Sequence, residues 1–68
     1  MPLSIVLNGE PRELAPGTTV AALLRELAIR DERVAVEVNL EVIRRDKRQE
    51  RVLSEGDRVE IVSFVGGG

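Results

Sequence analysis

The chain has 68 residues, of which 43% are hydrophobic and 32% are charged, and its formal net charge is −2. This composition is typical of one small globular domain and excludes a disordered chain. Ten basic against twelve acidic residues also argue against a binder of the nucleic-acid backbone, which would carry an excess of basic residues.

The sequence contains neither Cys nor His. This removes thiolate nucleophiles, disulfides, the usual zinc ligands and the commonest general base at neutral pH. Ser4, Ser54 and Ser63 therefore have no His to activate them. We expect no self-contained covalent or acid/base catalysis, and no metal or cofactor bound by the chain itself.

No apolar run approaches the roughly 20 residues that cross a bilayer. The segment from Met1 to Val6 also lacks the basic region and the long apolar core of a secretory signal. The expected location is the cytoplasm, with no membrane partner.

The first fourteen residues predict a β-hairpin at an edge of a sheet. Polar and apolar residues alternate from Leu3 to Asn8, which is the period of a half-buried strand. Asn8-Gly9 is a strong signal for a type I′ turn, so a second strand should return from Glu10 to Leu14. Pro11 favours an edge position for that strand.

A short amphipathic helix should follow the turn at residues 15–17. Thr18 or Thr19 is the natural N-cap, and the helix should end near Ala28 or Ile29. The apolar stripe, at i, i+3, i+4 and i+7, consists of Val20, Leu23, Leu24 and Leu27. Such a helix gains most of its stability by docking on the sheet.

A charged connection at residues 30–33 leads to a third alternating strand from Val34 to Val38. A tight turn at residues 39–41 then predicts a short strand at Val42-Ile43. The segment from Arg44 to Arg51 has five basic residues among eight, and we interpret it as a solvated loop. Binding of phosphates or of an acidic protein surface is the alternative for this loop.

After a turn at residues 54–57, the final strand should run from Arg58 to Val65, and its two faces differ. Val59, Ile61 and Val65 suit the core face. The opposite face begins with Arg58 and Glu60 and becomes apolar at Val62 and Phe64. Val6 lies on the outer face of the first strand, so a contact patch of Val6, Val62 and Phe64 is expected if these strands are neighbours. Alternatively, Phe64 closes one end of the core.

Gly66, Gly67 and Gly68 form a predicted flexible arm on a domain of residues 1–65. Three extended residues reach roughly 10 Å. Since the sequence offers few other reactive groups, the carboxylate of Gly68 is the candidate for chemistry.

The order strand, strand, helix, strand, short strand, strand predicts an α+β domain of the β-grasp, or ubiquitin-like, arrangement. We expect a mixed sheet of four to five strands with one helix packed on one face. The first and last strands should lie parallel at its centre, with the helix in the long crossover that parallel strands need.

The sequence resembles the thiamine-biosynthesis sulfur carrier proteins (ThiS) over essentially its whole length. The matching pieces are Asn8-Gly9, Gly17-Thr18-Thr19-Val20, Leu23-Leu24-Arg25-Glu26-Leu27, Val36-Glu37-Val38-Asn39, Val42-Ile43-Arg44, Glu55-Gly56-Asp57-Arg58-Val59-Glu60-Ile61 and Val65-Gly66-Gly67-Gly68.

The resemblance implies that an E1-like (ThiF-like) partner uses ATP and magnesium to adenylate the carboxylate of Gly68. Sulfur from a donor such as a cysteine desulfurase system then replaces AMP, and thiazole synthase (ThiG-like) receives it. Gly66 and Gly67 would be the spacer, and the chain would be a protein substrate rather than an enzyme.

Three alternatives share the predicted fold. The chain could be the small subunit of molybdopterin synthase, a ubiquitin-like modifier of lysines, or an interaction module with an inert tail.

Overall fold

The computed structural model describes residues 1–64. The predicted arm at Gly66 to Gly68, and the predicted last strand residue Val65, lie outside the described residues. The elements are β1 (Leu3–Leu7), β2 (Glu10–Leu14), α1 (Val20–Glu26), the 3-10 helix η1 (Asp31–Arg33), β3 (Val34–Val38), β4 (Glu41–Val42), the 3-10 helix η2 (Arg45–Lys47) and β5 (Arg58–Ser63).

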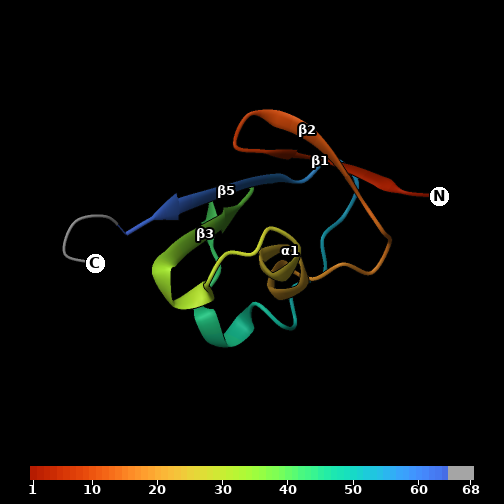
Figure 1. Cartoon of the computed structure of the whole chain (residues 1–68). Coiled ribbons are helices and arrows are strands. Elements are labelled where there is room, and N and C mark those ends of the chain that lie inside the picture. The colour runs from red at the N-terminus through yellow and green to blue at the C-terminus, as the bar shows by residue number, and fades with distance from the viewer. Residues whose placement is uncertain (65–68) are drawn as a thin grey trace.

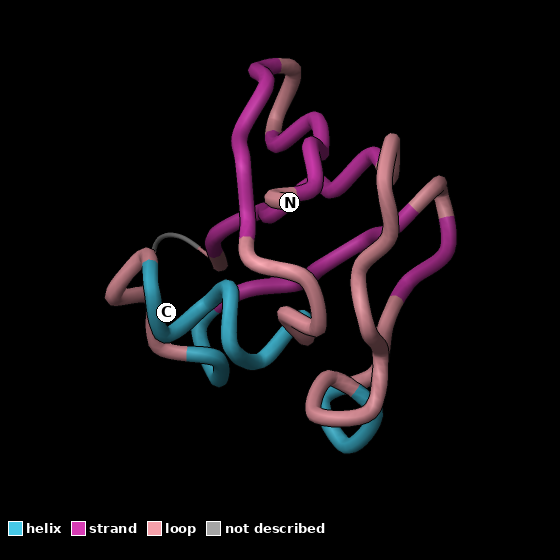
Figure 2. The backbone as a smooth tube through the Cα atoms, turned by 90° about the vertical axis from the view of Figure 1, so that its right-hand side faces the viewer, coloured by secondary structure: helices cyan, strands magenta, loops and turns pink. Residues whose placement is uncertain are grey.

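The five strands form one mixed sheet in the order β2-β1-β5-β3-β4 (Figure 1). β1 and β5 are parallel, and the other neighbouring pairs are antiparallel. The helical segments lie together on one side of the sheet, as Figure 2 shows from the side. This confirms the predicted β-grasp arrangement, with the first and last strands parallel at the centre.

The hairpin between β1 and β2 forms as predicted. Asn8 and Gly9 have φ angles of 49° and 85°, which are the positive values that a type I′ turn requires at both positions. Leu7 then faces Glu10, and Leu3 faces Leu14. β2 is an edge strand, so Pro11 removes no hydrogen bond from the sheet interior.

Helix α1 has the predicted cap but ends earlier than expected. The Thr19 hydroxyl accepts a hydrogen bond from the Ala22 amide at 3.1 Å. The helix ends at Glu26 because Ala28 takes a left-handed conformation, with φ of 58°. The Ala28 amide then donates to Arg25 and the Ile29 amide to Leu24, which is the Schellman pattern. The expected end at Ala28 or Ile29 is therefore wrong by two or three residues.

Strand β4 begins one residue before the predicted Val42-Ile43. Asn39 and Leu40 both have positive φ, at 54° and 70°, so the turn needs only these two residues. Glu41 pairs with Val38 as a result. Ile43 leaves the strand and enters the core, where it is 6% exposed.

The core lies between the sheet and α1. All predicted inward positions of β3 and the first two of the last strand, Val59 and Ile61, pack there. The buried hydrophobic residues are Ile5, Leu14, Val20, Leu23, Leu24, Val34, Val36, Val38, Ile43, Leu53 and Val59. The opposite face of the sheet has no covering layer among residues 1–64, and we call it the open face (Figure 1).

Candidate functional site

Strand β5 carries the chain from the middle of the sheet toward the predicted arm (Figure 1). It pairs with β3 from Val59 to Ser63. The Phe64 amide continues this ladder by donating to the Arg33 carbonyl at 2.9 Å. The last described residue is therefore still attached to the body of the domain, and the predicted site residues Gly66, Gly67 and Gly68 come after this attachment.

Asn8 supports β5 where β1 has already ended. Its backbone amide donates to the Val59 carbonyl at 2.8 Å, and its side-chain Oδ1 accepts from the Ile61 amide at 2.9 Å. The hairpin residue thus supplies the hydrogen-bond acceptor that a longer β1 would have supplied. These two hydrogen bonds hold β5 in place beyond the end of β1.

The open face is apolar near the predicted arm. Val62 and Phe64 are 59% and 58% exposed, and Ala35 lies opposite Val62 on β3. An exposed Val and Phe side by side on a small domain are typical of a contact surface. Because Phe64 is exposed, the alternative that it closes one end of the core is wrong.

The next row of the open face is acidic. Glu37 and Glu60 lie directly opposite one another on β3 and β5, and Val42 flanks Glu37 on β4. Like charges in this position disfavour the pairing of the two strands. The open face therefore combines an apolar end with two adjacent carboxylates.

Val6 does not belong to the same patch as Val62 and Phe64. The parallel register places Val6 beside Arg58, at the beginning of β5. Four residues of strand, or roughly 13 Å, separate this position from Val62. The expectation of one patch at the base of the arm is wrong for Val6, because β1 meets β5 at the opposite end.

The segment from Arg44 to Arg51 is not simply a solvated loop. Arg48 is 4% exposed, and its guanidinium donates to the carbonyls of Asp31 at 2.7 Å and Val34 at 2.8 Å. Burial lowers the pKa of Arg48, and the nearby Arg45 charge lowers it as well, whereas Asp31 raises it. The interpretation as a solvated loop is therefore wrong at Arg48, which braces the junction of η1 and β3.

Asp57 is a second buried charged residue that the sequence analysis missed. Its carboxylate accepts from Nδ2 of Asn39 at 3.0 Å and from the Ser54 amide at 2.8 Å. Asn39 in turn accepts from the Arg58 amide at 2.9 Å. The Ser-x-x-Asp turn at residues 54–57 could have predicted that this carboxylate binds backbone groups of the turn. The contacts join the β3–β4 turn to the start of β5.

Residues 1–64 hold no group of three or more Asp or Glu side chains arranged to bind a metal ion. Within the same residues, every helix is too short to span a lipid bilayer. In this part of the chain, hydrogen bonds from Ile61 to Asn8 and from Phe64 to Arg33 hold the end of β5, and the exposed side chains of Val62 and Phe64 form an apolar surface beside it.

Comparison with known proteins assigns the family. The model of the ThiS family matches residues 5–68. A sulfur carrier protein ThiS from Thermus thermophilus is 40% identical over 62 residues, which cover 91% of this chain and 95% of that protein. A thiazole synthase from Paramagnetospirillum magneticum is 42% identical over 66 residues. These cover 97% of this chain but 20% of the synthase, so the chain spans about a fifth of that relative.

The fold agrees with this assignment. The crystal structure of the thiamine biosynthesis protein ThiS from Geobacter metallireducens superimposes with a TM-score of 0.84 at 35% sequence identity. The match covers 97% of this chain and all of that one. The chain therefore belongs to the ThiS family.

Proposed function

We propose that this chain carries sulfur as a thiocarboxylate on Gly68 and donates it for thiazole formation. The observation that carries the proposal is the family match, which extends through residues 66–68. The attachment of β5 supports it, since the Phe64 amide, two residues before Gly66 in the sequence, is still hydrogen-bonded to the Arg33 carbonyl.

The chemistry requires activation because a carboxylate is a poor acyl donor. In the first step, an oxygen of the Gly68 carboxylate attacks the α-phosphorus of ATP and diphosphate leaves. Hydrosulfide then attacks the carbonyl carbon of the acyl adenylate, AMP leaves, and the thiocarboxylate forms after loss of a proton. When the donor presents a persulfide instead, an acyl disulfide forms, and a thiol must reduce its S–S bond to release the thiocarboxylate. An E1-like partner supplies the site for ATP and magnesium, and a donor such as a cysteine desulfurase system supplies the sulfur.

This chain contributes reach and docking. Gly66 and Gly67 act as a spacer that passes through a narrow channel because glycine has no Cβ. Ordering each backbone residue costs about 1 to 2 kcal/mol, so the arm needs compensating contacts from the body. Val62 and Phe64, which adjoin the arm and are exposed, supply these contacts.

Thiazole synthase is the proposed acceptor of the sulfur. Two relatives named thiazole synthase, from Paramagnetospirillum magneticum and Magnetococcus marinus, contain a segment that is 42% and 46% identical to this chain. A carrier-like segment joined to a synthase in one polypeptide favours direct transfer between the two. We place the reaction in the cytoplasm.

Intact-mass measurement tests the proposal. The chain is incubated with an E1-like partner, ATP, magnesium and a sulfur donor, and fragmentation then locates the change. We expect one oxygen to be replaced by sulfur at Gly68. No change with a partner shown to act on another carrier would contradict the proposal.

A variant with one residue appended after Gly68 is the matched control. It keeps the folded domain, which circular dichroism verifies, but moves the carboxylate to a different residue. We expect no sulfur transfer from it. Full activity of the extended chain would mean that the Gly68 carboxylate is not the reactive group.

A further inference from the structure

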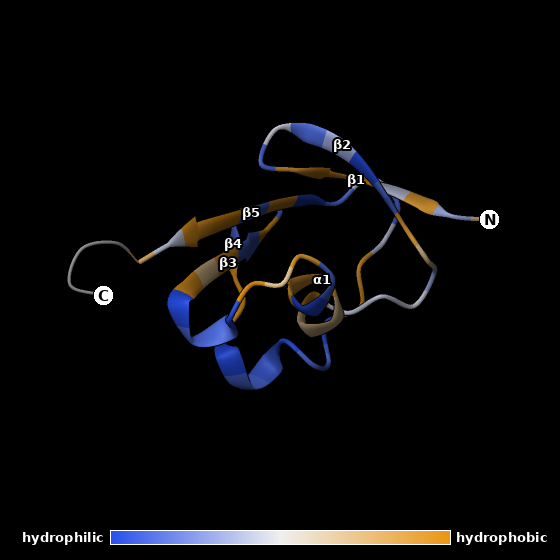
Figure 3. Ribbon diagram, viewed as in Figure 1, coloured by the Kyte–Doolittle hydropathy of each residue, from blue (hydrophilic) through white to orange (hydrophobic). Residues whose placement is uncertain are grey.

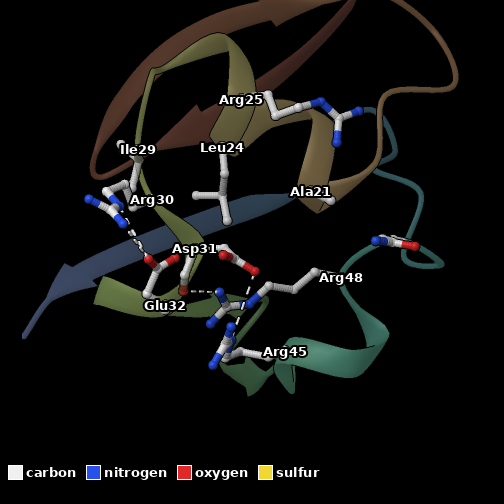
Figure 4. Close-up of a pocket in the computed structure, with 10 residues that line it drawn as sticks. Ala21, Leu24, Arg25, Ile29, Arg30, Asp31, Glu32, Arg45 and Arg48 are labelled. Carbon is white, nitrogen blue, oxygen red and sulfur yellow. Dashed lines mark hydrogen bonds and ion pairs between the residues drawn. The ribbon is translucent and has the colours of Figure 1, made fainter.

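A basic pocket of about 460 Å³ lies on the helical side of the domain, between α1, η1 and η2. Figure 4 shows its lining side chains, which come from two stretches of the chain, residues 21–32 and 45–49. We call it the arginine pocket after Arg25, Arg30, Arg45 and Arg48. Its other lining residues are Ala21, Leu24, Ile29, Asp31, Glu32 and Gln49. Hydrophilic residues dominate this side of the molecule around η1 and η2 (Figure 3).

The positive charge of the arginine pocket is only partly neutralised. Four arginines and two acidic residues line the pocket. Arg30 pairs with Glu32 at 3.1 Å, but the closest contact of Arg45 with Asp31 is 3.8 Å, which is too long for a hydrogen bond. Arg25 forms no ion pair with the described residues 1–64. The pocket therefore has a net positive charge and free donors.

Arg48 makes this charge a fixed part of the fold. Its two terminal nitrogens bind the Asp31 and Val34 carbonyls, so the guanidinium cannot swing out into water. Its Nε is buried and has no hydrogen-bond partner among residues 1–64. Figure 4 shows the guanidinium groups of Arg45 and Arg48 beside each other, next to Asp31. Asp31 offsets part of the repulsion between these two like charges, and a bound anion would offset more of it.

We propose that the arginine pocket binds a small anion with a phosphate group. A phosphate can accept hydrogen bonds on several oxygens in different directions, which suits arginines that line the pocket from different sides (Figure 4). A carboxylate offers two oxygens in one plane and would leave donors unused. The concave shape and the modest volume also suit a small molecule better than a flat protein surface.

The position of the pocket places the anion near the base of the predicted arm. Asp31 and Glu32 belong to η1, which ends at Arg33, and the Arg33 carbonyl accepts from Phe64. An anion bound here lies on the side of the sheet opposite Val62. The proposal is thus independent of the proposed function.

Titration of the full chain with diphosphate, followed by ¹H–¹⁵N correlation NMR, tests the proposal. Parallel titrations use inorganic phosphate and glycerol 3-phosphate, and sodium chloride at equal ionic strength is the control. We expect saturable shifts for the amides of Ala21, Arg25, Asp31 and Gln49. Stronger binding of glycerol 3-phosphate would identify an ester as the ligand, and stronger binding of inorganic phosphate would identify the free ion.

Two variants and a matched control locate the site. Arg25→Gln and Arg45→Gln should each weaken diphosphate binding about tenfold, the value of one charge-assisted hydrogen bond. Arg44→Gln removes the same charge from the neighbouring residue, which does not line the pocket, and should change the affinity by less than about twofold.

Three outcomes would overturn the proposal. These are shifts that never saturate, equal losses of affinity in Arg44→Gln, and tighter binding of an acidic peptide than of diphosphate. The last result would assign the pocket to a protein partner. The spectra of the variants also verify that they fold, so a loss of binding is not confused with unfolding.

Discussion

The side chain of Asn8 accepts a hydrogen bond from the backbone amide of Ile61 at 2.9 Å, across 53 positions of sequence. Asn8 therefore has two roles. Its positive φ closes the β1–β2 hairpin, and its Oδ1 holds the outgoing half of β5 beyond the end of β1. The turn at one edge of the sheet thus helps to set the path of the central strand toward the predicted arm.

Replacement of Asn8 separates these two roles. Asn8→Gly keeps the positive φ but removes the acceptor. The free energy of unfolding should fall by about 1 to 2 kcal/mol, because the hydrogen bond is lost and because glycine gives the unfolded chain more conformational entropy. Urea unfolding measures this change, and amide exchange at Ile61 should become faster. Asn8→Asp retains an acceptor and is the control. Unchanged exchange at Ile61 in Asn8→Gly would show that the side-chain bond does not protect β5.

Leu40 is the residue whose backbone conformation fits its side chain least. Its φ is 70° and its side chain is 88% exposed, so the left-handed conformation brings no compensating burial. Leu40→Gly should stabilise the domain by about 1 kcal/mol, since Asn-Gly is the preferred type I′ turn. Thermal unfolding measures this as a rise of roughly 4 to 8 °C in Tm. A fall in Tm would show that Leu40 makes a stabilising contact that its exposure hides.

The sequence was sufficient for the order of the elements because their periods and turn residues are strong local signals. Asn8-Gly9, the Thr19 cap and the stripe at Val20, Leu23 and Leu24 each formed as predicted. The register between β1 and β5 is a tertiary property, and it moved Val6 away from Val62. No local signal encodes which residues of two distant strands meet.

Arg48 was missed for a different reason. In a segment rich in charged residues, hydropathy predicts solvent exposure for all of them. Only the folded chain brings the Asp31 and Val34 carbonyls to the guanidinium of Arg48. The early end of α1 has a similar origin, since Ala28 takes a conformation that usually belongs to glycine. In both cases the preference of the residue type alone does not predict the conformation or burial that the residue adopts.

Removal of the Arg48 brace should destabilise the domain more than removal of any exposed arginine. Arg48→Met fills a similar volume but leaves two backbone carbonyls without donors, so we expect a loss of about 2 to 3 kcal/mol. Arg44→Met is the control, because Arg44 is exposed and, among residues 1–64, pairs only with Asp46, at 3.4 Å. It should change stability by less than about 0.5 kcal/mol. Chemical denaturation compares the two. Equal effects would mean that the Arg48 hydrogen bonds contribute no net stability.

The register of β5 predicts which residues of the open face dock on the proposed E1-like partner. Val62 and Phe64 adjoin the arm and are exposed, whereas Val6 lies beside Arg58 at the far end of the open face. Phe64→Ala should weaken recognition by an E1-like partner by about 2 kcal/mol, as expected for a buried aromatic anchor. Val62→Thr should have a smaller effect, and Val6→Thr should have almost none.

The KM for each variant as a substrate, measured by ATP–diphosphate exchange, tests this order. The three substitutions act on docking and leave Gly68 unchanged, so kcat should stay close to that of the natural chain while KM rises. Val6→Thr is the same substitution as Val62→Thr and therefore controls for the replacement of a methyl group by a hydroxyl on the same face. If Val6→Thr raises KM as much as Val62→Thr, the partner covers the whole open face, and the contact is not confined to the end that adjoins the arm.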